Sequence, residues 1–144
     1  MSTPLSLPSA LAGKRVLIVE DEYLIADDLA RELTDAGAEV IGPAGSLPHA
    51  MRLTSQAGRI DAAVLDINLR ETLAYPLIDQ MIEEGVKVLI SSGYDEAMIP
   101  ERYRHLPWCD KPVSPTKLRQ AAERLWDGDP IRAVPFAQER PYRR

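Results

Sequence analysis

Acidic side chains gather at the ends of short apolar runs in this sequence. The apolar run Val16–Val19 leads directly into three acids, Glu20, Asp21 and Glu22, and a later apolar run ends on Asp66. Carboxylates that share one small site repel one another and raise each other's pKa unless a positive charge lies among them. If the fold brings these acids together, they therefore predict a site for a cation.

A hard divalent cation bound through oxygen atoms fits this set of side chains best. Mg²⁺ takes one or two carboxylates and keeps several waters and a phosphate oxygen in its coordination shell. Ca²⁺ fits less well, because no loop presents oxygen ligands at alternate positions over about a dozen residues. Zn²⁺ fits poorly, since His49, His105 and Cys109 are scattered without the spacing of zinc ligands.

Beside such a metal, one carboxylate is free to act as a nucleophile, and carboxylates form aspartyl-phosphate intermediates. Asp66 is the candidate, because it stands alone at the end of its apolar run. Lys111 offers a compact positive charge to a phosphoryl oxygen, and Ser92 offers a hydroxyl donor. Phosphoryl transfer needs little beyond such positioning and charge neutralisation. The residue types therefore predict phosphoryl chemistry.

The elements that must position these residues alternate between strand and helix patterns. Strands are expected at 15–19, 38–42, 60–67, 86–93 and 107–112, and helices at 23–37, 46–58, 75–85 and 114–126. Such alternation implies parallel pairing and predicts a three-layer α/β sandwich around a doubly wound, five-stranded sheet. The C-terminal ends of all strands then lie along one edge, where the acids, Ser92 and Lys111 converge.

Length and composition limit the classes of protein that this chain can belong to. With 144 residues, 45% of them hydrophobic, the sequence predicts one globular domain at 14–126. We expect the segments 1–13 and 127–144, the latter containing Pro and Arg, to be flexible. The single cysteine excludes an internal disulfide, and no apolar run approaches the roughly 20 residues of a membrane span. We therefore expect a soluble, cytoplasmic protein that does not act at a membrane.

Four motifs carry a resemblance to a known family. They are VLIVEDE, AVLDINL, VLISSGY and DKP, and they lie at the ends of successive expected strands. In this order and close to this spacing, they resemble the receiver domain of bacterial two-component response regulators, most of all the stand-alone receivers that carry no output domain. The resemblance covers residues 15 to about 126. It implies a flavodoxin-like sheet with the strand order 2-1-3-4-5.

The resemblance assigns the metal site and the phosphoacceptor. Asp66 matches the phosphoacceptor, and Asp21 matches the direct Mg²⁺ ligand. Glu20 fills the neighbouring acidic position, which usually acts through water. The backbone carbonyl of Asn68 is the further contribution that the protein is expected to make to the metal.

The resemblance also assigns residues that respond to the phosphoryl group. Ser92 matches the switch hydroxyl, and Lys111 matches the lysine that precedes a proline in the family. Trp108 falls where the family often has an aromatic switch residue. Asn68 and Tyr94 occupy positions that tune how fast the phosphoryl group is lost.

One segment departs from the family pattern. The chain between Ser92 and Lys111 is a few residues shorter than in many receivers, and Pro100 falls where the fourth helix of a receiver belongs. A proline there removes an amide donor and clashes with the preceding turn. We therefore expect a fourth helix that is short, broken or mobile, as in a subgroup of stand-alone receivers to which residues 91–112 are similar.

The leading functional hypothesis is a phosphorylatable single-domain response regulator. It accepts a phosphoryl group on Asp66 from a sensor histidine kinase or a histidine phosphotransfer protein, with Mg²⁺ bound. It then signals through contacts with a downstream protein or acts as a phosphate sink. The net charge of −5 argues against direct DNA binding, and the 18 residues after Trp126 are too few for a helix-turn-helix module. We expect no enzymatic activity beyond its own phosphorylation and dephosphorylation.

Two other functions fit parts of the sequence. A phosphatase with an aspartyl-phosphate intermediate would need a second acid two residues after the nucleophile, and that position holds Asn68. A receiver-like module that binds its partner unphosphorylated would predict the loss of an acid, a hydroxyl or the lysine. All three kinds of group are present in the sequence.

Overall fold

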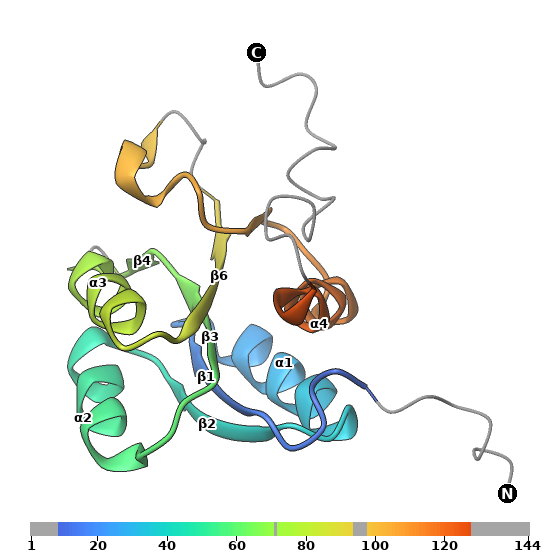
Figure 1. Ribbon diagram of the computed structural model, residues 1–144. Coiled ribbons are helices and arrows are strands. Elements are labelled where there is room, and N and C mark those ends of the chain that lie inside the picture. Colours follow the sequence, from blue (N-terminus) through green and yellow to red (C-terminus); the bar gives the residue numbers. More distant parts are fainter. Residues whose placement is uncertain (1–8, 71, 94–97, 128–144) are drawn as a thin grey trace, which may run out of the picture.

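The computed structural model describes residues 9–70, 72–93 and 98–127. Over these ranges, helices and strands alternate along the chain (Figure 1). The strands of the main sheet are β1 (Arg15–Val19), β2 (Glu39–Ala44), β3 (Ala62–Asp66), β6 (Lys87–Ser92) and β7 (Trp108–Asp110). The helices are α1 (Tyr23–Asp35), α2 (Leu47–Ala57), α3 (Tyr75–Glu83) and α4 (Pro115–Glu123). Two short strands, β4 (Asn68–Leu69) and β5 (Thr72–Leu73), pair separately, and 3₁₀ turns cover η3 (Glu101–Tyr103) and η4 (Arg124–Trp126).

The main sheet is parallel throughout and has the order β2-β1-β3-β6-β7. Counted along the chain, this is the order 2-1-3-4-5, so the fold class inferred from the sequence is confirmed. The register places Asp66 beside Ser91 and Ser91 beside Cys109. Because every strand points the same way, all five C-terminal ends lie along one edge of the sheet.

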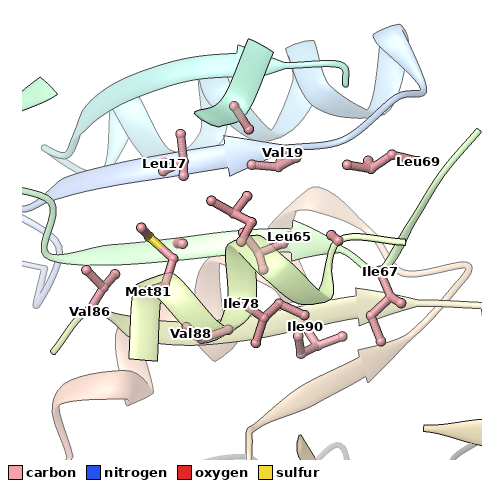
Figure 2. Packing of buried hydrophobic residues seen from close by; sticks show 14 of the residues in the cluster. Leu17, Val19, Leu65, Ile67, Leu69, Ile78, Met81, Val86, Val88 and Ile90 are labelled. Atoms are coloured by element: carbon pink, nitrogen blue, oxygen red, sulfur yellow. The ribbon is translucent and has the colours of Figure 1, made fainter. Parts of the chain in front are cut away.

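Both faces of the sheet are covered by helices. In Figure 1, α2 and α3 lie on one side of the strands, while α1 and α4 lie on the other. Successive residues of a strand point to opposite faces. Leu17 and Val19 therefore pack in the cluster under α3, shown in Figure 2, whereas Val16 and Ile18 pack in the cluster under α1 and α4. Burial on both faces explains why the strands read as continuous apolar runs.

The helix ends follow the expected capping residues. The side chain of Ser46 accepts a hydrogen bond from the His49 N–H at 3.2 Å, and that of Ser114 accepts one from the Lys117 N–H at 3.1 Å. Gly37, which follows α1, has a φ of 98°, a left-handed conformation that favours glycine. Among the described residues, no helix is both long enough and apolar enough to cross a membrane.

The packed part of the chain extends to the N-terminal side of residue 14, where the sequence placed the domain boundary. Leu11 is fully buried in the cluster under α1 and α4, and the Ser9 hydroxyl donates a hydrogen bond of 2.8 Å to Glu123. Residues 1–8 and 128–144, which hold most of the two expected flexible segments, lie outside the described residues.

The connection from β6 to β7 replaces the fourth helix of the expected fold. From residue 98 onward its described part contains no α-helix, and the 3₁₀ turn η3 begins directly after Pro100. The expectation of a short or broken helix is confirmed for these residues. Tyr103 packs the turn against α3. Its ring stacks on that of Tyr75 with 4.9 Å between the ring centroids, and its hydroxyl donates a hydrogen bond of 2.6 Å to Asp79.

Candidate functional site

The site is built by the ends of three strands at the C-terminal edge of the sheet. Glu20 and Asp21 follow β1 directly, Asp66 ends β3, and Lys111 follows β7. Backbone hydrogen bonds fix two of these ends. The Glu20 N–H donates to the Ala44 carbonyl at 2.9 Å, and the Lys111 N–H donates to the Ser92 carbonyl at 2.9 Å. The parallel sheet therefore brings the predicted residues together from distant parts of the chain.

Three carboxylates meet at this edge. One oxygen from each of Glu20, Asp21 and Asp66 can be chosen so that all three atoms lie within 4.8 Å of one another. Glu20 and Asp66 are buried, while the side chain of Asp21 retains 15% of its exposure. Such an all-oxygen donor set, with one carboxylate partly exposed, could hold a metal ion and fits the preferences of Mg²⁺.

Lys111 lies between two of the carboxylates. Its Nζ is 2.8 Å from Glu20 Oε1 and 2.8 Å from Asp66 Oδ2. The side chain of Lys111 keeps only 19% of its exposure, so these ion pairs are shielded from solvent. A buried carboxylate without a partner is strongly unfavourable. Lys111 therefore makes the close approach of Glu20 and Asp66 tolerable.

The protonation equilibria of Glu20 and Lys111 reflect this crowding. Burial raises the pKa of the Glu20 carboxyl above its usual value, and the hydrogen bond from Lys111 offsets this only in part. Burial lowers the pKa of the Lys111 ammonium, but the hydrogen bonds and charges of Asp66 and Glu20 outweigh it and raise that pKa. The lysine is therefore held in its charged form between the two acids.

Backbone donors orient the same two carboxylates. The Asn68 N–H donates to Asp66 Oδ1 at 3.1 Å, so Lys111 and the backbone hold different oxygens of that carboxylate. The Glu22 N–H donates to Glu20 Oε2 at 3.0 Å. Both acids are thus fixed in direction before any ligand binds, which lowers the reorganisation needed for chemistry at the site.

An open pocket of about 450 Å³ lies over the carboxylates. Its lining combines acids, two cationic side chains and a glycine that adds no side-chain bulk: Asp21, Glu22, Asp66, Asn68, Arg70, Gly93 and Lys111. The volume is sufficient for a hydrated metal ion together with a phosphoryl group. The chemistry that the pocket can perform is therefore acceptance of a phosphoryl group by Asp66 beside a cation.

The remaining predicted residues lie around this centre or apart from it. Ser92 is buried at the end of β6, next to the pocket-lining Gly93. Trp108 is 5% exposed and packs in the cluster on the α2 and α3 side of the sheet. Tyr94 lies outside the described residues. The switch roles of Ser92 and Trp108, and the tuning roles of Asn68 and Tyr94, stay predictions.

Arg70 is the lining residue that the sequence reasoning missed. It lies between β4 and β5, four positions after Asp66, and its Nε is 3.8 Å from Asp21 Oδ2. The two-residue strands of this hairpin are too short to give a periodic pattern. The available signal is a basic residue shortly after Asp66, in the stretch DINLR.

Comparisons with known proteins were consistent across sequence and structure. No model of a known protein family matches the chain. A curated relative, the transcriptional regulatory protein PdtaR of Mycobacterium tuberculosis, is 27% identical to this chain. The aligned region covers 85% of this chain but only 62% of the length of PdtaR. The solved structure of SdrG from Sphingomonas melonis Fr1 is 30% identical with a TM-score of 0.66, over 81% of this chain and 98% of SdrG. The response regulator protein TrrA from Thermotoga maritima, solved in complex with Mg²⁺-BeF, is 21% identical with a TM-score of 0.65, over 78% of this chain and 98% of TrrA. A response regulator receiver domain (CheY-like) from Methylobacillus flagellatus is 23% identical with a TM-score of 0.65, over 79% of this chain and 99% of that domain.

Proposed function

The chain belongs to the receiver-domain family of response regulators, and from this premise we propose that it is a signalling switch phosphorylated on Asp66. One observation carries the proposal. Lys111 Nζ is 2.8 Å from Asp66 Oδ2, and one oxygen from each of Glu20, Asp21 and Asp66 can be chosen so that the three atoms lie within 4.8 Å of one another. A nucleophilic carboxylate, a lysine and an oxygen-rich metal site thus lie together at one open pocket, and phosphoryl transfer depends mainly on such positioning and charge neutralisation.

Glu20, Asp21 and Asp66 would hold Mg²⁺, with the backbone carbonyl of Asn68 as a further ligand. The donor set supports this assignment, because it consists of three carboxylates, and burial raises the pKa of Glu20 even though Lys111 donates to it. The Mg²⁺-BeF complex of TrrA, a protein of the same fold, supports it as well. When bound, the metal neutralises negative charge on the carboxylates and on the transferred phosphoryl group.

The phosphoryl group would come from a phosphorylated histidine of a sensor kinase or of a phosphotransfer protein. In the transfer, an oxygen of Asp66 forms a bond to phosphorus while the bond from phosphorus to the histidine nitrogen breaks. The nitrogen keeps the electron pair of that bond. The imidazole leaves in its neutral form if its other ring nitrogen carries a proton, and otherwise it leaves as an imidazolate that takes a proton from water. Lys111, already beside Asp66, donates to the phosphoryl oxygens, and the Ser92 hydroxyl is the second donor.

A downstream protein would bind the phosphorylated state, or the chain would act as a phosphate sink that removes phosphoryl groups from a shared kinase. Lys111 connects the pocket to the rest of the domain, because it directly follows β7, which carries the buried Trp108. A change in the contacts of Lys111 would therefore reach Trp108 through three residues of extended chain. This is the route by which we propose that phosphorylation alters the surface near the β6–β7 connection.

The test is the mass of the intact protein after incubation with acetyl phosphate, with and without Mg²⁺. The wild type should gain one phosphoryl group only when Mg²⁺ is present, and Asp66→Asn should gain none. Asp61→Asn is the matched control, since Asp61 precedes the same strand that Asp66 ends. An equal gain in Asp66→Asn, or a gain that does not depend on Mg²⁺, would contradict the proposal.

A further inference from the structure

Two cationic side chains, Lys111 and Arg70, lie beside the carboxylates at this edge of the sheet. Each of them contacts different carboxylates. Lys111 contacts Glu20 and Asp66, at 2.8 Å in each case. Asp21 is instead approached by Arg70, whose Nε is 3.8 Å from Asp21 Oδ2 and whose Nη2 donates to the Asp21 carbonyl at 3.4 Å. The residue that the family resemblance makes the direct metal ligand is thus the one that Arg70 contacts.

The short hairpin of β4 and β5 fixes the backbone of Arg70 close to the pocket. Ile67 and Leu69, on the N-terminal side of the hairpin turn, are buried in the core, and the Ala74 N–H donates to the Ile67 carbonyl at 2.8 Å. Arg70 itself has a φ of 54°, which a non-glycine residue adopts only where its surroundings impose it. The backbone is therefore held while the side chain, 80% exposed, is free to move.

The contacts of Arg70 with Asp21 are weak enough to be exchanged. Both distances exceed that of a good charged hydrogen bond, and exposed ion pairs contribute little free energy. A guanidinium group presents planar, paired N–H donors that match the oxygens of a phosphoryl group better than they match one distant carboxylate oxygen. Arg70 and Asp66 line the same pocket, so the new partner would lie within reach.

We propose that Arg70 is a second cationic residue of the phosphoryl pocket, paired with Asp21 before ligands bind and turned onto the phosphoryl group afterwards. This role rests on the proposed function, since it concerns the phosphoryl group on Asp66. It has two opposed consequences. The positive charge weakens the binding of a metal cation at Asp21, and it strengthens the retention of the phosphoryl anion by covering the side of the pocket that is open to water.

The cation arm of the test is calorimetric titration of Mg²⁺ into wild type, Arg70→Gln and Arg70→Lys. Loss of the charge should tighten Mg²⁺ binding about threefold, the size expected for one screened charge near a divalent ion. Arg70→Lys should stay close to the wild type. Arg31→Gln is the control, because Arg31 is exposed and paired with Asp27 and Asp28 on α1. Unchanged or weaker Mg²⁺ binding by Arg70→Gln would overturn the proposal.

The anion arm uses beryllium fluoride at saturating Mg²⁺, together with the rate at which the phosphorylated protein loses its phosphoryl group. Arg70→Gln should bind beryllium fluoride about threefold more weakly and lose the phosphoryl group faster. A merely structural role would shift cation and anion binding in the same direction. Equal or tighter binding of beryllium fluoride, or a longer-lived phosphorylated state, would overturn the proposal. If the wild type takes no phosphoryl group from acetyl phosphate, the proposed function fails, while the two titrations still decide the role of Arg70.

Discussion

Two clusters of acids and cations lie at opposite edges of the same sheet, and they are balanced differently. At the N-terminal edge, Asp61 accepts a hydrogen bond of 2.8 Å from the Arg15 N–H and one of 3.1 Å from Arg59. The Arg15 guanidinium donates in turn to the carbonyls of Ala57 and Arg59, both at 2.6 Å. Here Asp61 is held by one backbone N–H and one guanidinium, while the Arg15 guanidinium, which also lies 3.4 Å from Glu39, ties the end of α2 to the first strand.

At the C-terminal edge, the acids exceed the close cations. Glu20 and Asp66 share the single ammonium of Lys111, and Asp21 has only the distant contact with Arg70. The pKa values of Glu20 and Asp61, one acid from each cluster, shift in opposite directions. Burial raises the pKa of Glu20, whereas the bonds from Arg15 and Arg59 outweigh burial at Asp61 and lower its pKa.

The same residue types therefore serve two purposes in one domain. A cluster in which each acid finds its donors contributes to the stability of the fold. Where carboxylates exceed the close cations, we expect a bound cation to stabilise the fold. We infer that the balance of charge within a cluster, rather than the presence of acids, indicates whether the cluster can serve as a ligand site.

The largest expected effect comes from removing the shared cation. Lys111→Met leaves two buried carboxylates facing each other, so we expect a loss of about 2 kcal/mol in the free energy of unfolding at neutral pH. Urea titration measures it. Mg²⁺ should restore part of the loss, because it supplies the missing positive charge. A variant as stable as the wild type, with no response to Mg²⁺, would show that the carboxylates are not strained.

A smaller effect is expected at the opposite edge. Asp61→Asn should reduce the free energy of unfolding by about 1 kcal/mol at neutral pH, since it weakens the bonds from Arg15 and Arg59. The pKa of Asp61 is lowered in the folded protein, so its contribution is complete above the unfolded pKa and disappears as the pH falls through the folded pKa.

The difference between wild type and Asp61→Asn should therefore shrink in acid. Urea titrations at a series of pH values from neutral to strongly acidic would follow it. A difference that grows as the pH falls would contradict the assignment of Asp61 as the stabilising acid of its edge. Mg²⁺ should have the same effect on this variant as on the wild type.

The smallest effect is expected at Arg59. Its side chain is 62% exposed, and its ion pair with Asp61 at 3.1 Å is open to solvent. Arg59→Gln should change the free energy of unfolding by less than about 0.5 kcal/mol. Thermal unfolding would measure it, and a larger change would mean that Arg59, rather than the Arg15 backbone, holds Asp61.

The sequence predicts the edge of the sheet better than the loops that complete it. Parallel strands and capped helices follow from apolar periodicity, and the topology then brings Asp66 and Lys111 together although 45 positions separate them. The position of Pro100 correctly indicated an interrupted helix. These features could be predicted because local propensity and the global fold agree.

The contacts made by the loops and by the N-terminal segment could not be predicted from local sequence patterns. The burial of Leu11, the stacking of Tyr103 on Tyr75 and the approach of Arg70 to Asp21 all depend on which segments become neighbours. Arg70 adopts its backbone conformation because buried residues beside it impose that conformation, and no residue preference signals it. The sequence predicts that Lys111 and Glu20 lie along the same edge of the sheet. It does not predict that these two side chains pair directly.

The central claim is that the acids at the C-terminal edge form a cation site. The most direct test is thermal unfolding of wild type, Asp21→Asn and Asp61→Asn with and without Mg²⁺. We expect Mg²⁺ to stabilise the wild type and Asp61→Asn but not Asp21→Asn, which should be at least as stable as the wild type without the metal. A wild type that does not respond to Mg²⁺, or an Asp21→Asn variant that responds equally, would contradict it.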